Sequence, residues 1–103
     1  MDTEKAVREY WFETETGDRL MIAAVYKRRA WYTVEMTSFE GFVQKPKGFR
    51  KLKDSLHYAA GFGEKYIRDA LEYWVKTYGS DPITDKPIAD AFHIVVIGGE
   101  NHV

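Results

Sequence analysis

The sequence predicts an α+β fold in which two helices pack on one face of a mostly antiparallel sheet, in the order β-β-β-α-α-β. Three observations lead to this prediction. Residues 7–36 contain three segments rich in β-branched and aromatic residues, separated by turn residues. Residues 49–78 have the apolar spacing of amphipathic helices, and residues 93–97 form a further β-branched run. A chain of 103 residues has room for one domain, which we expect to span residues 1–103.

The first three strands are expected to form an antiparallel meander. Val7–Glu15 and Leu20–Tyr26 flank a turn signal at Gly17-Asp18. Because Leu20–Tyr26 is apolar on both faces, we expect it to be the central strand, covered above and below. Lys27-Arg28-Arg29 then forms a polar hairpin tip before Ala30–Met36, whose even-numbered positions make one apolar face.

The middle of the chain changes to helical spacing. Phe39–Gly48 contains glycines and a proline, so it predicts a loop. The apolar residues of Phe49–Leu56 make a short helical stripe, and we expect Gly61-Phe62-Gly63 to end this first helix. Residues 64–78 predict a second helix with an apolar face about 140° wide, which the glycine at position 79 caps.

The last part of the chain predicts one more strand. An irregular connection is expected between Pro82 and Pro87, and Ile88–Phe92 has no clear assignment. His93–Ile97 is β-branched and ends at Gly98-Gly99, so we expect a buried strand that returns to the sheet beside the meander.

Composition excludes several classes of site and location. The chain has no cysteine, which excludes disulfides, iron–sulfur clusters and thiolate zinc sites. The charged amino terminus leads into no signal-peptide core, and no apolar run reaches the roughly 20 residues that span a bilayer. We therefore expect a complete, cytoplasmic protein without membrane contact.

Catalytic and metal-binding patterns are lacking in the sequence. His57, His93 and His102 fall in a helix, a strand and a tail, without metal-ligand spacing. The aspartates at 81, 85 and 90 do not match a calcium loop. Residues 61–66 (GFGEKY) resemble a phosphate loop only in part, because a tyrosine replaces the third glycine, and a helix–helix corner is the simpler interpretation. We predict no enzyme activity, no cofactor and no metal site.

Charge is sorted along the chain. Residues 19–53 hold nine Lys and Arg against two Asp and Glu, a net of +7. Residues 1–18 hold two against six, and residues 54–103 hold four against eight, so each flank carries −4 and the total is −1. A basic middle between acidic flanks favours an anionic partner that binds at one part of the surface.

Two basic clusters within this segment form the candidate binding surface. The first lies at the hairpin tip, and the second runs from a loop into a helix start, where the helix dipole opposes cations. Phenylalanines interleave with the second cluster, a mixture suited to an interface. The alternative is that they fill the core while the lysines keep the loop soluble. The predicted partner-binding residues are Lys27, Arg28, Arg29, Phe42, Lys45, Lys47, Phe49, Arg50, Lys51 and Lys53.

Aromatic residues on the strands are too numerous for one covered face. Either the C-terminal segment covers Trp11 and Trp31, which is the preferred alternative, or these side chains form an exposed patch that needs a partner.

The leading functional hypothesis is a small non-catalytic binding module that docks on, and inhibits or regulates, a protein or ribonucleoprotein partner with an acidic surface. Phage-carried inhibitors such as anti-CRISPR proteins share this size and composition, although they have no common motif. Direct DNA or RNA binding through the same basic segment is the alternative hypothesis, and the acidic flanks argue against it.

Overall fold

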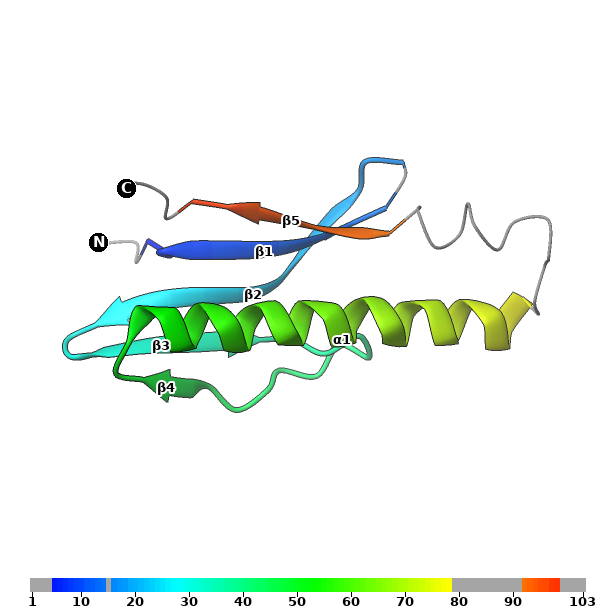
Figure 1. Ribbon diagram of the computed structural model, residues 1–103. Coiled ribbons are helices and arrows are strands. Elements are labelled where there is room, and N and C mark those ends of the chain that lie inside the picture. Colours follow the sequence, from blue (N-terminus) through cyan, green and yellow to red (C-terminus); the bar gives the residue numbers. More distant parts are fainter. Residues whose placement is uncertain (1–4, 15, 79–91, 99–103) are drawn as a thin grey trace.

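The computed structural model describes residues 5–14, 16–78 and 92–98 (Figure 1). Every strand pairing is antiparallel, and the sheet order is β4-β3-β2-β1-β5. The α+β class and the antiparallel sheet are therefore confirmed. The elements in chain order are β1 (Arg8–Glu13), β2 (Arg19–Arg28), β3 (Trp31–Met36), β4 (Lys47–Phe49), α1 (Leu52–Tyr78) and β5 (His93–Ile97).

The predicted meander is present as β1, β2 and β3, and β2 is the central strand. Ile22 is an extra residue in β2, because Ala23 pairs with Tyr10 whereas Met21 already pairs with Trp11. α1 lies along one face of the sheet, called the inner face below (Figure 1). The expectation that β2 is covered above and below is confirmed for Ile22–Val25, which are buried on both faces. Of the described elements only α1 covers a face, so side chains of the sheet itself bury Ala24 on the opposite, outer face.

One continuous helix replaces the two predicted helices. Gly61 and Gly63 lie inside α1, which therefore has no helix–helix corner and no helix amino terminus at which residues 61–66 could hold a phosphate. A Cβ atom on Gly63 would lie 3.5 Å from the Cγ1 atom of Ile94 in β5. A Cβ atom would thus be in ordinary van der Waals contact with β5, whereas a larger side chain at this position would crowd Ile94. Glycine costs about 1 kcal/mol relative to alanine in a helix interior.

The predicted loop over residues 39–48 ends in a short strand. Gly41 adopts a positive φ of 94° in a turn closed by its N–H to the Ser38 carbonyl. The chain then returns along β3, where Lys47 pairs with Val34 and β4 forms. The observed order is therefore β-β-β-β-α-β, and the short helix predicted from residue 49 begins instead at Leu52.

The core lies between α1 and the inner face. Tyr10 and Phe12 of β1 are buried there, and the Phe12 ring lies 5.0 Å from that of Tyr66 in α1. The C-terminal strand returns to the sheet beside the meander, as predicted, and pairs with β1. The expectation that this strand is buried is wrong, because β5 lies at the sheet edge, where Val96 and Ile97 are exposed. The other buried apolar residues are Ile22, Ala23, Ala24, Val25, Val34, Met36, Ala59 and Ala70.

Several predictions lie outside the described residues. They are the cap at residue 79, the connection over residues 82–87, the segment 88–91, the aspartates at 81, 85 and 90, and the histidine at 102. Within the described residues, no helix is long and apolar enough to cross a membrane.

Candidate binding surface

The two basic clusters meet at one end of the molecule. Arg28 and Trp31 form the last residue pair of the β2–β3 hairpin, and β4 lies beside β3 and leads into α1. The Arg50 guanidinium carbon lies 4.6 Å from the centre of the Trp31 ring, so a residue of the second cluster stacks on the hairpin tip. In Figure 1 this tip and the start of α1 lie at the same end of the molecule.

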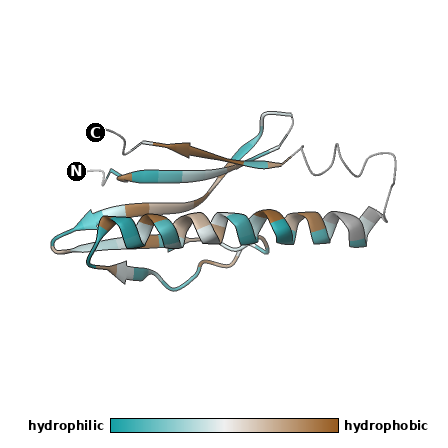
Figure 2. Ribbon diagram, viewed as in Figure 1, coloured by the Kyte–Doolittle hydropathy of each residue, from teal (hydrophilic) through white to brown (hydrophobic). Residues whose placement is uncertain are grey.

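We call this region the basic end and define it by Lys27, Arg28, Arg29, Lys47, Arg50, Lys51 and Lys53. Hydrophilic residues dominate the β2–β3 turn and the start of α1 in Figure 2. Two carboxylates belong to the same region, Glu35 in β3 and Asp54 in the first turn of α1. The cations outnumber them, so the described residues of this end carry a net positive charge even though the chain carries a net charge of −1.

Three of the predicted binding residues, Phe42, Lys45 and Phe49, do not belong to the basic end. Phe42 is 70% exposed, but it lies beside Ser38, seven residues along from Trp31 and hence about 20 Å from the tip at strand spacing. Lys45 lies between the tip and Phe42. Phe49 points to the inner face, where its ring packs 5.3 Å from that of Tyr58, so this phenylalanine contributes to the core.

Aromatic rings hold four of the cations at the basic end. Each ring belongs to a strand or to α1, so each cation is fixed to the folded frame while its charge stays near solvent. The distances to the ring centres are 5.4 Å for Lys27 and Tyr32, 4.7 Å for Arg28 and Tyr26, 5.8 Å for Lys47 and Tyr58, and 4.6 Å for Arg50 and Trp31.

These aromatic partners were not among the predicted site residues. The sequence does indicate that Trp31 lies beside a cation, because a two-residue turn after Arg28 places the Arg28 and Trp31 side chains opposite each other. The contact with Arg50 depends on β4, which the sequence pattern does not indicate. Tyr58 belongs to α1 and reaches Lys47 only because the helix starts beside β4.

The start of α1 bears cations where helix energetics disfavour them. The Lys51 carbonyl accepts the N–H of Ser55 at 3.2 Å, which makes Lys51 the N-cap residue. Lys53 follows in the first turn. Both ammonium groups lie at the positive end of the helix dipole and provide no acceptor for the first N–H groups of the helix.

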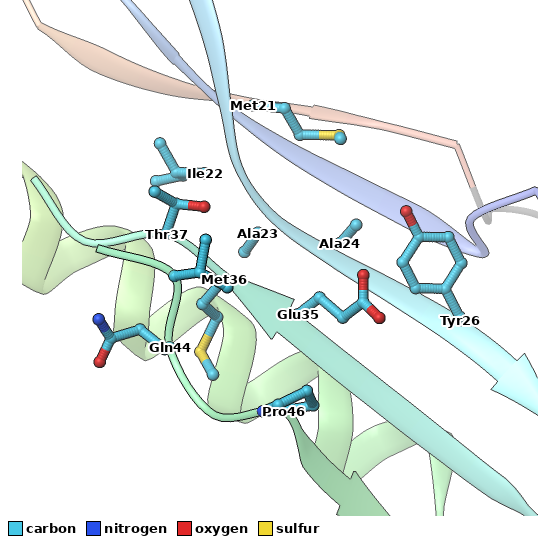
Figure 3. Close-up of a pocket in the computed structure, with 11 residues that line it drawn as sticks. Met21, Ile22, Ala23, Ala24, Tyr26, Glu35, Met36, Thr37, Gln44 and Pro46 are labelled. Atoms are coloured by element: carbon cyan, nitrogen blue, oxygen red, sulfur yellow. The ribbon is translucent and has the colours of Figure 1, made fainter. Parts of the chain in front are cut away.

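A groove of about 360 Å³ lies on the outer face and extends toward the basic end (Figure 3). Met21 contributes exposed apolar surface from β2, where Ala24 is buried, and Tyr26 and Glu35 line the groove beside Arg28. Arg28 stacks on the Tyr26 ring and pairs with Glu35 at 3.0 Å, which joins the groove to the basic end. The other lining residues are Ile22, Ala23, Met36, Thr37, Val43, Gln44 and Pro46.

The two strand tryptophans differ in exposure. Trp31 is 45% exposed, so for this residue the structure contradicts the preferred alternative of cover by the C-terminal segment. Trp11 is half-buried, and its indole N–H donates to Glu9 at 3.0 Å. The described C-terminal residues contribute to this burial from the side, because Val95 of β5 pairs with Trp11 across the sheet.

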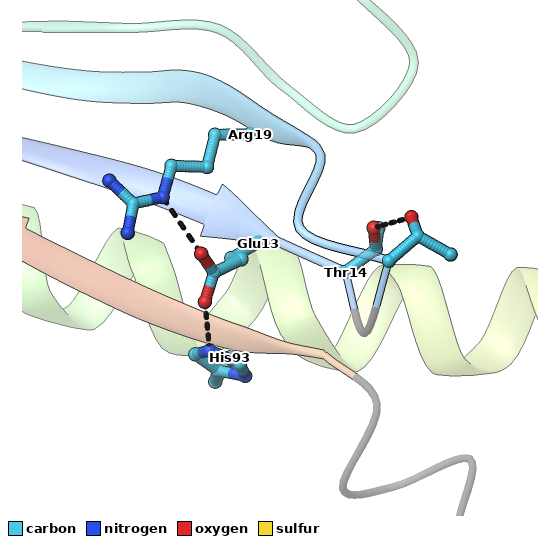
Figure 4. Close-up of polar contacts among 5 residues, drawn as sticks. Glu13, Thr14, Arg19 and His93 are labelled. Atoms are coloured by element: carbon cyan, nitrogen blue, oxygen red, sulfur yellow. Dashed lines mark hydrogen bonds and ion pairs between the residues drawn. The ribbon is translucent and has the colours of Figure 1, made fainter.

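A polar cluster joins three strands at the end of the sheet away from the basic end (Figure 4). One Glu13 carboxylate oxygen accepts from Arg19 Nε at 2.8 Å, and the other contacts His93 Nε2. The hydrogen bond from Arg19, with that from His93, lowers the pKa of Glu13 below its ordinary value. Within the described residues, no three His, Asp or Glu side chains are grouped so as to hold a metal ion.

Comparison of the chain with protein-family models, with curated proteins and with solved structures finds no match.

Proposed function

We propose that this chain is a non-catalytic binding module whose basic end, together with the adjoining groove, docks on an acidic surface of a protein partner. The observation that carries the proposal is the stack of Arg50 on Trp31, which joins two basic clusters that are separate in the sequence. Arginine and tryptophan are the residue types that most often supply interface binding energy. The groove supports the proposal because it offers apolar surface next to the charges.

Direct nucleic-acid binding is the second candidate, and the stacking of arginines on aromatic rings favours it. Carboxylates on the outer face argue against it. Ala24 of β2 pairs with Glu9 of β1 on one side and with Glu35 of β3 on the other. Because paired residues share a face of the sheet, both glutamates lie on the outer face with Ala24. A phosphate backbone that crossed this face would meet two negative charges, whereas a protein partner can place donors there.

Site-specific photocrosslinking tests the proposal. A benzophenone amino acid at the exposed Ala30 of the β2–β3 turn should capture the partner in cells, whereas the same probe at Tyr73, which is exposed on α1, should not. The capture should be lost in Arg50→Glu/Lys51→Glu and retained in Arg68→Glu/Lys76→Glu, which changes the net charge equally elsewhere on α1. A captured protein that is unaffected by the first pair of reversals would refute the role of the basic end.

Fluorescence anisotropy with mixed DNA and RNA separates the two candidates. If about five cations met phosphates, log K would fall with log salt at a slope of roughly −4.5 on duplex DNA. We expect no salt-sensitive binding at low micromolar protein. Tight binding with such a slope, lost in Arg50→Glu/Lys51→Glu, would favour nucleic acid instead.

A further inference from the structure

β5 ends the sheet at an edge with no strand beside it in the described part of the chain. The strand order places β1 on one side of β5 and nothing on the other. Backbone N–H and C=O groups along such an edge form a ready template for another strand. A further strand can therefore pair with this edge unless the side chains of β5 prevent it.

The side chains of β5 do not oppose strand addition. Its residues 94–97 are Ile-Val-Val-Ile, without charge, proline or glycine. The opposite edge is different, because β4 has three residues, carries Lys47 and Gly48, and follows Pro46. Short length, charge and proline are common ways to blunt a sheet edge, so one edge of this sheet is protected and the other is open.

Apolar surface adjoins the open edge on both faces. Val96 is 50% exposed on the inner face, and Ile97 is 40% exposed on the outer face. Most of β5 is coloured as hydrophobic in Figure 2. Between β5 and the flank of α1, a groove of about 530 Å³ is lined by Leu52 and Leu56, with Tyr10, Ala60, Val96 and the polar residues Arg8, Lys53 and His57.

We propose that two copies of this chain associate through β5, with antiparallel pairing about a two-fold axis at Val95. This register pairs all five residues of the strand, since Ile94 then lies opposite the second copy's Val96. Directly opposite residues of antiparallel strands share a face, so the second copy's Ile94 and Val96 extend the inner apolar face beside the groove. The strand is complementary to itself, as an isologous interface requires.

Charge placement favours the antiparallel arrangement. Ile97 pairs with Glu9 toward the basic end of the molecule, whereas His93 pairs with Glu13 at the other end. Antiparallel pairing therefore puts the two basic ends at opposite ends of the dimer. Parallel pairing would place them side by side, where like charges repel.

Sedimentation equilibrium with matched variants tests the proposal. The wild-type mass should rise from 12.0 kDa toward twice that value with concentration. Val96→Glu should weaken dimerisation at least about tenfold, because two carboxylates would be buried beside the strand pair. Leu20→Glu, at a similarly exposed apolar site on β2, should leave the dissociation constant unchanged. A wild type that stays monomeric up to about 1 mM would overturn the proposal. So would equal changes of the dissociation constant in Val96→Glu and Leu20→Glu.

Disulfide trapping gives a second test that does not depend on stability. The chain has no cysteine, so Val95→Cys introduces the only thiol. At the two-fold axis the two Cα atoms would be about 4.5–5.5 Å apart, within the range that a disulfide bridges. In His93→Cys the separation would be about 13 Å. Rapid oxidation to a covalent dimer in the first variant only would support the proposal, and equal or reversed rates would refute it.

Discussion

Replacing Lys51 with aspartate is expected to stabilise the fold and to weaken partner binding. Lys51 is the N-cap of α1, where its ammonium group has no acceptor to offer the first N–H groups and opposes the helix dipole. Aspartate is one of the preferred N-cap residues, because its carboxylate accepts those N–H groups and has the favourable charge.

The expected gain in the free energy of unfolding of Lys51→Asp is the sum of two contributions. An N-cap acceptor is worth about 1 kcal/mol, and the reversal of charge adds about 0.5 kcal/mol after allowance for repulsion from Asp54. For 103 residues the entropy of unfolding is about 0.2 kcal/mol/K, so a gain of about 1.5 kcal/mol raises Tm by about 7 °C.

Urea and thermal unfolding followed by circular dichroism measure this gain. Lys51→Ser is the matched control, because it adds the cap without the negative charge and should give most of the stabilisation. An unchanged or lower free energy of unfolding in Lys51→Asp would show that the account of this helix start is incorrect. Photocrosslinking from position 30 with the same variant reports the loss of binding separately from the gain in stability.

Three further predictions concern other described positions. Arg29 has a positive φ of 58°, so Arg29→Gly should stabilise the protein by about 1 kcal/mol in urea unfolding; a loss would contradict strain in this turn. Gly61→Ala should gain roughly 1 kcal/mol, because open space surrounds its Cβ position, whereas Gly63→Leu should lose about 1–3 kcal/mol by crowding Ile94; similar effects would disprove the close approach. The lowered pKa of Glu13 stabilises the fold above the ordinary value of 4.5, and this contribution is lost as pH falls through the lowered pKa. Glu13→Gln should therefore reduce the stability difference between pH 7 and pH 3 in urea unfolding, and an unchanged difference would exclude this contribution.

The strands were predictable because their signals are local. Period-two patterning and turn residues define β1, β2 and β3 within a few positions. The predicted helix end at residues 61–63 was wrong, because glycine can end a helix or lie inside one that tertiary contacts hold together, and the sequence pattern does not distinguish these cases. The partner of Gly63 is Ile94, 31 positions along the chain, so the deciding contact is not local.

The candidate surface was predictable in its parts but not in its assembly. The cations at the hairpin tip and before α1 are visible as runs of Lys and Arg. Their meeting depends on β4, whose three residues contain a glycine and follow a proline, so the segment has no strand periodicity. The pairing of β4 with β3 brings Arg50 to Trp31, and this tertiary contact turns two sequence clusters into one surface.

The placement of these residues argues for binding rather than for solubility. Solubility requires charges on the surface, but not a lysine at an N-cap or an arginine with positive φ. Among the described non-glycine residues, Arg29 is the one with positive φ, and it lies at the same end as Lys51 and the exposed ring of Trp31. Departures from local preference that gather in one region are expected where function, not stability, selects the residues. If Lys51→Asp and Arg29→Gly each raise stability while abolishing capture, this trade-off is demonstrated at the basic end.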